Sequence, residues 1–216
     1  MNDLFSASQS RALSAEHLAD GAVVLHGKAL AAEIEILHDI EKITSRSPFR
    51  RMTVPGGHVM SVAMTNCGQA GWVSDRSGYR YDKIDPLTGQ PWPSMPGSFL
   101  LLAQSAASEA GYQAFVPDVC LINRYEPGAK LSLHQDKDEL NFDSPIVSVS
   151  LGLPATFQFG GAKRADTLRK IRLEHGDIVV WGGPSRLFYH GILALKDGEH
   201  DKVGRMRLNL TFRAAL

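Results

Sequence analysis

Residues 131–139 read LSLHQDKDE, and this stretch decides the fold and the chemistry that we expect. It begins with the alternation of polar and apolar residues that is typical of a β-strand. Side chains two positions apart on a strand point to the same side, so His134 and Asp136 are predicted to converge as two metal ligands. The alternative is that the triplet arises by chance and that His134 is an ordinary hydrogen-bonded residue.

A third ligand is predicted much later in the chain, in the segment LFYHGI. His190 stands at the end of this apolar, aromatic-rich run, which is typical of a buried strand. Two histidines and one carboxylate on one face of a metal leave the opposite positions open, and non-haem Fe(II) oxygenases bind their cosubstrate and oxygen there. The hypothesis is an iron centre held by His134, Asp136 and His190.

The whole second half of the chain, from Pro117 onward, is a series of short strands bounded by Gly and Pro. Such a series favours a sandwich or a barrel, so we expect an all-β core. The predicted strands lie in VCLINRY, KLSLHQD, IVSVSLG, ATFQFG, IRLEHGDIVVWGG, RLFYHGI and RLNLTFR.

The last of these segments, residues 207–213, alternates strictly between polar and apolar residues. One face carries two arginines, which are costly to bury unless an anion pairs with them. An inward-facing pair would suit a dicarboxylate such as 2-oxoglutarate. The alternative is an edge strand whose polar face is wet. In residues 119–125, Asn123 and Tyr125 also share a face and could donate hydrogen bonds to a carboxylate, or could form an ordinary polar outer side.

The first half contains two predicted helices. Residues 29–43 have apolar side chains at helical spacing, and residues 98–110 are followed by Gly111 in the position of a helix stop. The apolar positions of the first helix are Leu30, Ile34, Leu37 and Ile40. We expect this helix to pack against a sheet. Ahead of it, residues 21–25 look like a short buried strand, and after it a Pro-Gly-Gly turn precedes the second arm of a hairpin at residues 59–65.

Residues 68–97 are rich in Gly, Pro, Trp and Tyr, which predicts loops and short strands. Large aromatic side chains on loops either anchor the loop to the core or bind a ligand. Composition adds little about partners, because 23 basic residues balance 23 acidic ones. Two basic clusters, at 46–51 and 163–172, could contact phosphates or could be solvated surface.

The 216 residues suit one domain, and their 44% hydrophobic and 21% charged content is ordinary for a globular protein. No segment is long and apolar enough for a membrane span, and the opening MNDLFSASQS lacks the pattern of a secretion signal. We therefore expect a cytoplasmic protein without a membrane partner. Cys67 and Cys120 are predicted to be buried free thiols.

Taken together, these motifs closely resemble the AlkB family of Fe(II)- and 2-oxoglutarate-dependent dioxygenases, and in particular its bacterial DNA repair members. The resemblance extends from Gly21 to Arg213. It is carried by SPFR, PGGH, MSVAMTNCG and PWPSMP in the first half, then by NRYEPGAKLSLHQDKDE, PIVSVSLGLPATFQFGG, EHGDIVVWGGPSRLFYHGI and NLTFR.

The resemblance implies a mainly β, α+β fold. Its core would be a double-stranded β-helix, or jelly roll, with N-terminal buttressing helices and a nucleotide-recognition lid. The implied organisation is a flexible N-terminus at residues 1–20 and a single dioxygenase domain at 21–216. Within that domain the lid would span residues 45–97 and the catalytic core residues 115–216.

The same resemblance implies the site. His134, Asp136 and His190 would be the catalytic iron ligands, with 2-oxoglutarate and O2 as cosubstrates. The residues implied to hold 2-oxoglutarate are Asn123, Tyr125, Arg207, Asn209 and Arg213. The residues implied to bind the substrate base or nucleic acid are Met64, Trp72, Tyr79, Asp138 and Arg164, with His134 stacking on the base.

The implied activity is oxidative demethylation of alkylated bases such as 1-methyladenine and 3-methylcytosine, releasing formaldehyde, succinate and CO2. Single-stranded DNA would be preferred, with double-stranded DNA and RNA as further substrates, and the protein would be a monomer. Val54 and His58 depart from the family pattern, as does the segment 198–206, and these departures bear on phosphate contacts and substrate preference. The alternatives are an oxygenase acting on a protein or small molecule, and a non-catalytic cupin-like binding module.

Overall fold

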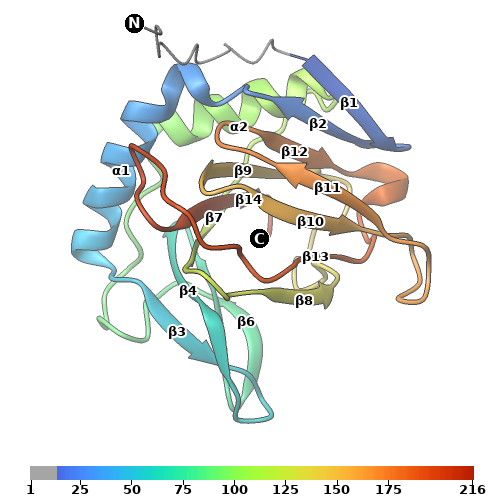
Figure 1. Ribbon diagram of the computed structural model, residues 1–216. Helices are drawn as coiled ribbons and strands as arrows, with labels where there is room; N and C mark the ends of the chain where they lie inside the picture. The colour runs from blue at the N-terminus through green and yellow to red at the C-terminus, as the bar shows by residue number, and fades with distance from the viewer. Residues whose placement is uncertain (1–13) are drawn as a thin grey trace, which may run out of the picture.

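The computed structural model describes residues 14–216, which form two antiparallel sheets and one hairpin (Figure 1). The larger sheet has eight strands in the order β1-β2-β12-β9-β14-β7-β4-β3, and the smaller has the order β11-β10-β13-β8. The strands of the larger sheet are β1 (Ser14–Ala19), β2 (Ala22–His26), β12 (Ile178–Trp181), β9 (Ile146–Gly152), β14 (Arg207–Arg213), β7 (Val119–Tyr125), β4 (Val59–Gly68) and β3 (Arg50–Thr53). The others are β11 (Arg169–Leu173), β10 (Ala155–Phe159), β13 (His190–Ile192), β8 (Leu131–His134) and, in the hairpin, β5 (Gly71–Asp75) and β6 (Gly78–Asp82).

Strand β14 organises the core because its two faces have different partners. Leu208, Leu210 and Phe212 pack into a cluster with the helices, while Arg207 and Arg213 lie on the opposite face, toward the smaller sheet. The strand is hydrogen-bonded to β7 on one side and β9 on the other, and all seven of its residues are buried. The prediction that the arginines face inward is therefore confirmed, and the alternative of a wet edge strand is wrong.

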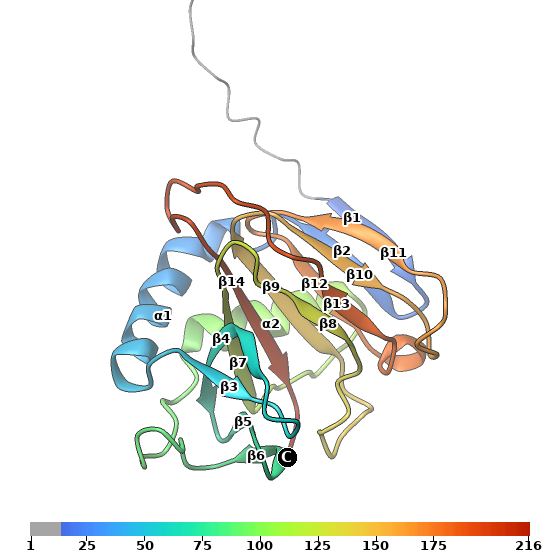
Figure 2. The same cartoon turned by 60° about the horizontal axis from the view of Figure 1, so that its bottom comes forward.

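The two sheets face each other across a second apolar cluster (Figure 2). Phe157 and Ile192 contribute to it from the smaller sheet, and Val179 and Trp181 from the larger. Phe157, Trp181 and Ile192 of this cluster also line a cavity between the layers. Polar side chains of β14 and β7 line the same cavity, so the space between the two sheets is not filled by apolar packing alone.

Helices α1 (Glu33–Arg46) and α2 (Gly97–Glu109) pack on the outer face of the larger sheet (Figure 1). The predicted apolar face of α1 is partly wrong: Ile36, Ile40 and Ile43 are buried, whereas Ile34 is 74% exposed. Residues 30–32 form a 3₁₀ turn, so the α-helix begins later than its apolar periodicity indicated. Neither helix, nor any other among residues 14–216, is long and apolar enough to cross a membrane.

The expectation of a flexible N-terminus is wrong for residues 14–19, and residues 1–13 lie outside the described part of the chain. Residues 14–19 form β1, which pairs antiparallel with β2. Arg169 of β11 donates hydrogen bonds to the carbonyl oxygens of His17 and Leu18, which fixes the strand to the smaller sheet. These contacts come from a distant segment, so the polar sequence SAEHLA alone did not reveal the strand.

The segment 198–206, which departs from the family pattern, docks on the start of α1. His175 accepts a hydrogen bond at Nδ1 from the Gly152 amide, so its Nε2–H donates to Glu33 Oε2, 2.6 Å away. Lys202 also donates to the Glu33 carboxylate, and the His200 ring stacks on His175 with centroids 4.2 Å apart. Glu33 therefore joins α1 to the chain that leads into β14.

A pH-dependent contribution to stability follows from Glu33. Burial opposes its ionisation, but hydrogen bonds from Lys202 and His175 lower its pKa below the ordinary value of 4.5. A lowered folded-state pKa gives stabilisation above about pH 4.5 that is lost as the pH falls through the folded-state pKa. We expect Glu33→Gln to lower Tm by about 2–4 °C at pH 7, for a loss of about 1 kcal/mol, and by less near pH 3. Thermal unfolding followed by circular dichroism measures this, with the exposed neighbour Glu35→Gln as the control. An equal difference at both pH values would contradict it.

Candidate active site

The three predicted metal ligands converge at the inner face of the smaller sheet. His134 ends β8 and His190 begins β13, and the two residues stand directly opposite each other in the register of these strands. One ligand atom from each of His134, Asp136 and His190 lies within 4.8 Å of the others. The structure therefore brings together all three residues of the predicted centre.

One detail of the sequence prediction is wrong: Asp136 is not on the strand. Strand β8 ends at His134, and Asp136 lies in the irregular segment that follows. Its position is set by two arginines, because Arg186 donates to its carbonyl oxygen and Arg213 donates to its carboxylate Oδ2. The convergence of His134 and Asp136 thus results from tertiary contacts and not from the alternation of a strand.

Both histidines are held in the orientation that a metal ligand needs. His134 Nδ1 lies 2.8 Å from the Ser132 carbonyl oxygen, and His190 Nδ1 lies 3.0 Å from the Phe188 carbonyl oxygen. A carbonyl can only accept, so each Nδ1 carries the hydrogen and the neutral ring keeps its lone pair on Nε2. Outer partners of this kind fix the tautomer of metal-binding histidines.

The protonation states also suit a cation. Burial opposes ionisation of Asp136, but the Arg213 guanidinium and the two histidines lower its pKa well below the ordinary value. Burial, with the help of His134, lowers the pKa of His190 to about 4. At neutral pH Asp136 is therefore a carboxylate and His190 a neutral imidazole, and together with the His134 ring they form the donor set of a facial iron centre.

A cavity of about 720 Å³ opens beside the three ligands. Its inner wall carries the five residues predicted to hold 2-oxoglutarate, which are Asn123, Tyr125, Arg207, Asn209 and Arg213. Within residues 14–216, Arg207 Nε and Nη1 and Arg213 Nη1 are buried without a hydrogen-bond partner. Buried polar groups are nearly always paired, so these N–H groups mark the place of an anionic ligand.

Arg207 is the clearer of the two cases. It is 1% exposed, its Nη2 donates to Ser150 Oγ, and its guanidinium lies 5.0 Å from the centre of the Tyr125 ring. None of the ion pairs found in the described chain includes it, whereas Arg213 is paired with Asp136 and Glu139. The donor set therefore fits an iron at the three ligands and a dicarboxylate that reaches both arginines.

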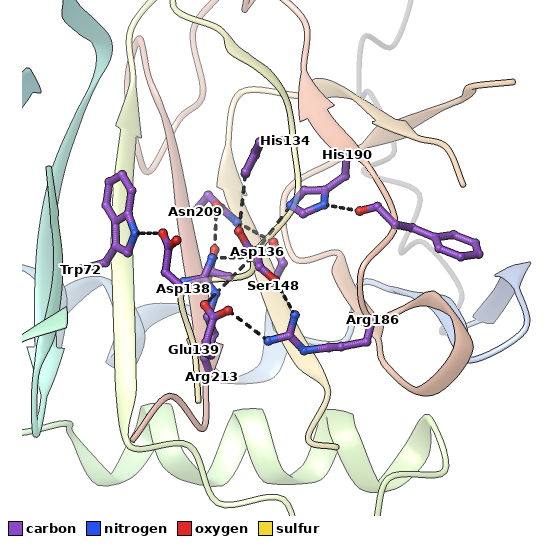
Figure 3. Close-up of polar contacts among 12 residues, drawn as sticks. Trp72, His134, Asp136, Asp138, Glu139, Ser148, Arg186, His190, Asn209 and Arg213 are labelled. Carbon is purple, nitrogen blue, oxygen red and sulfur yellow. Dashed lines mark hydrogen bonds and ion pairs between the residues drawn. The ribbon is translucent and has the colours of Figure 1, made fainter. Parts of the chain in front are cut away.

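The residues predicted to bind the substrate line the same cavity: Met64, Trp72, Tyr79, Asp138 and Arg164. The Trp72 and Tyr79 rings stack with centroids 5.6 Å apart and planes 14° from parallel. Trp72 Nε1 donates to the Asp138 carboxylate at 2.8 Å (Figure 3). Val54 and His58 also line the cavity, in the turn between β3 and β4.

Sequence reasoning missed a group of residues behind the ligands. Figure 3 shows Glu139 and Arg186 beside Arg213, and Glu139 also accepts a hydrogen bond from the Tyr81 hydroxyl at 2.7 Å. Glu139 belongs to the opening stretch LSLHQDKDE, where nothing distinguishes it from the other acidic residues. No local pattern connects it to Tyr81 or Arg186, since both come from distant segments.

Comparisons with known proteins agree with this geometry. Residues 21–213 match the model of the 2OG-Fe(II) oxygenase superfamily. The chain is 62% identical over 200 residues to the alpha-ketoglutarate-dependent dioxygenase AlkB of Escherichia coli strain K12, covering 93% of each chain. It is 31% identical over 160 residues to the DNA N(6)-methyladenine demethylase ALKBH1C of Arabidopsis thaliana, covering 62% of this chain and 35% of that protein.

A solved structure supports the fold. The structure of OsALKBH1 superposes with a TM-score of 0.80 and 30% identity, covering 93% of this chain and 99% of that one. The mainly β architecture of two antiparallel sheets thus matches the jelly roll of these oxygenases. The chain belongs to the AlkB family of the 2OG-Fe(II) oxygenase superfamily, and it is an Fe(II)- and 2-oxoglutarate-dependent dioxygenase that uses O2.

Proposed function

We propose that the chain oxidatively demethylates alkylated nucleobases, with 1-methyladenine and 3-methylcytosine in DNA as substrates. The observation that carries the proposal is that one cavity holds the three metal ligands, two arginines with unpartnered N–H groups and the stacked pair of Trp72 and Tyr79. An oxygenase site beside a flat aromatic wall suits a planar base. The relatives whose printed names mention nucleic acid support the same substrate class.

Each of two arginines would bind one carboxylate of 2-oxoglutarate. Arg213 adjoins Asp136, so it would take the carboxylate next to the metal, while Arg207 would take the far carboxylate at the buried end of the cavity. Tyr125 lies beside Arg207 and Asn209 lies between the arginines on β14. The Asn209 amide already donates to Ser148 Oγ and the Val149 carbonyl, which fixes its orientation.

Iron would be held by His134, Asp136 and His190, and with 2-oxoglutarate it supplies activation of O2 for hydroxylation, with succinate and CO2 as products. The chain would position the target methyl group beside the three ligands. Hydroxylation of an N-methyl group gives a hemiaminal, which releases formaldehyde and leaves the unmodified base.

The base would enter against Trp72, with Tyr79 behind it and His134 on the metal side. Methylation at N1 of adenine or N3 of cytosine makes the base cationic, and the Asp138 carboxylate lies on the cavity wall. Asp138 is exposed, so its attraction for the cation is screened by solvent. Arg164, whose guanidinium lies 5.8 Å from the centre of the Tyr189 ring, would meet a phosphate of the nucleic acid.

Residues 45–97 would act as the lid over the base, residues 115–216 as the catalytic core, and α1 and α2 as the buttress of the sheet within a single domain at 21–216. Single-stranded DNA would be preferred, because a base must leave the stack to reach the cavity and an unpaired base does so at lower cost. Activity on double-stranded DNA and RNA, the monomeric state and a cytoplasmic location stay predictions.

The proposed activity is tested by mass spectrometry of a single-stranded oligonucleotide with one 1-methyladenine, incubated with Fe(II), ascorbate and protein, with and without 2-oxoglutarate. We expect the loss of one methyl mass only in the complete mixture. Succinate formation without demethylation would move the search to protein or small-molecule substrates. Absence of both would favour a non-catalytic binding module.

The aromatic wall gives a prediction of its own. Trp72→Ala is expected to raise KM for the methylated oligonucleotide roughly 5- to 150-fold, since stacking on one aromatic ring contributes about 1–3 kcal/mol per base. The KM for 2-oxoglutarate should stay within about twofold of wild type, because the Trp72 indole bonds to the exposed Asp138 and to neither of the two arginines. Steady-state kinetics in each cosubstrate measure both. Tyr79→Phe keeps the aromatic ring and is the control. An unchanged oligonucleotide KM for Trp72→Ala would show that the base does not stack on Trp72.

A further inference from the structure

Glu139 is a buried carboxylate that contacts three side chains and has no role in the proposed reaction. It is 5% exposed, and one of its carboxylate oxygens, Oε1, lies 3.1 Å from Arg213 Nε and 2.7 Å from the Tyr81 hydroxyl. The other oxygen, Oε2, lies 3.3 Å from Arg186 Nη2. A buried carboxylate with three charged or polar donors around it holds those donors in fixed relative positions.

Glu139 helps to fix the orientation of the Arg213 guanidinium. Its Nε lies 3.1 Å from both Asp136 Oδ2 and Glu139 Oε1, and its Nη2 lies 2.6 Å from Asp136 Oδ2. Two carboxylates thus hold the guanidinium on two sides, while its Nη1 has no hydrogen-bond partner among residues 14–216 and Arg213 itself lines the cavity. Without Glu139, Arg213 could turn fully onto Asp136, and its guanidinium would no longer be fixed in its present place in the cavity wall.

Glu139 also binds the hairpin of β5 and β6, through the Tyr81 hydroxyl. Trp72 and Tyr81 are direct partners across this hairpin, and they bond to consecutive residues of the ligand segment, Asp138 and Glu139. Tyr81 itself is not among the residues that line the cavity. The hairpin that carries the Trp72 and Tyr79 wall is therefore attached to the cosubstrate arginine through the single carboxylate of Glu139.

We propose that Glu139 is a positioning residue that aligns Arg213 for the cosubstrate carboxylate and, through Tyr81, fixes the hairpin that carries the base-binding wall. The part about the wall rests on the proposed nucleobase substrate, whereas the part about Arg213 needs only the 2-oxoglutarate site. A substitution of Tyr81 should then weaken 2-oxoglutarate binding, although Tyr81 does not line the cavity.

The test measures binding without turnover. Calorimetry with Mn(II) in place of Fe(II) gives the Kd of 2-oxoglutarate, and fluorescence anisotropy gives the Kd of a labelled single strand with one 1-methyladenine. We expect Glu139→Gln to raise the 2-oxoglutarate Kd roughly 10-fold, because a charge-assisted contact to Arg213 is lost. Tyr81→Phe should raise both Kd values roughly three- to fivefold, because it removes one hydrogen bond to Glu139.

Tyr112→Phe is the matched control. Its hydroxyl is also partly buried and donates to a backbone carbonyl, that of Gly21, outside the cavity. This variant should leave both Kd values within about twofold of wild type, since it loses a similar hydrogen bond elsewhere. Comparable changes in all three variants would mean a general loss of stability and would overturn the proposal.

Other outcomes are equally decisive. An unchanged 2-oxoglutarate Kd in both Glu139→Gln and Tyr81→Phe would overturn the proposal, and so would a Tyr81→Phe variant that changes oligonucleotide binding alone. If Glu139→Gln does not fold, Tyr81→Phe decides. If the wild-type protein binds 2-oxoglutarate but no methylated oligonucleotide, the proposed substrate is wrong, while the 2-oxoglutarate measurements still decide the role of Glu139 toward Arg213.

Discussion

Replacing Arg207 by methionine is expected to abolish measurable 2-oxoglutarate binding while leaving the protein at least as stable as wild type. Arg207 is 1% exposed, and neither its Nε nor its Nη1 has a hydrogen-bond partner among the described residues. Burial lowers its pKa, although the side chain stays charged at neutral pH. A buried charge without a protein counter-ion costs free energy of folding, and the bound dicarboxylate would offset that cost.

The expected size of the effect on binding is large. Losing a charge-assisted, two-pronged contact in a buried site costs about 3 kcal/mol or more, which corresponds to an increase of at least about 100-fold in the Kd of 2-oxoglutarate. Calorimetry with Mn(II) measures the binding, and Tm measures the stability. Arg207→Lys should retain weak binding because it keeps the charge but not the fork of the guanidinium. A methionine variant that binds 2-oxoglutarate normally, or that loses several degrees of Tm, would contradict this account of Arg207.

Asp136→Asn is the second large effect. The asparagine has nearly the same shape but no charge, so the site loses its only anionic ligand among the three residues. Removing even the outer partners of metal ligands costs about 10- to 100-fold, so we expect the rate of 2-oxoglutarate turnover to fall by more than about 100-fold. Titration with Fe(II) under anaerobic conditions should show weaker binding in parallel.

The control for Asp136→Asn is Asp143→Asn, an exposed acid in the same irregular segment. It should leave turnover and metal affinity unchanged. Asp136→Asn should also lower Tm, because Arg213 would keep Glu139 as its only carboxylate partner. Normal turnover in Asp136→Asn would exclude this carboxylate as an iron ligand.

The sequence predicted best those features that depend on local alternation. The strict period of two in residues 207–213 indicated which side chains share a face, and the structure places Arg207 and Arg213 together on the cavity side. The end of the second helix at Gly111 was also predicted from a local signal. The φ of Gly111 is +91°, a conformation that favours glycine. The site residues implied by the family resemblance likewise line one cavity.

Predictions failed where a distant segment decides a local conformation. The helix at residues 29–43 was placed several residues too early, because the 3₁₀ turn at residues 30–32 precedes it. Strand β1 exists because β2 and Arg169 supply its partners, and none of them is visible in SAEHLA itself. Asp136 was assigned to a strand, yet two arginines from later in the chain hold it beyond the end of that strand.

By itself the sequence determined the residue types of the metal centre and the inward face of the last strand, since both follow from side-chain chemistry and the period of a strand. Only the tertiary structure decided how the groups are paired. It placed Glu139 between Arg213, Arg186 and Tyr81, and among residues 14–216 it left Arg207 without a carboxylate partner. Electrostatic partners are chosen by distance and burial after packing, and neither quantity is a property of a short stretch of sequence.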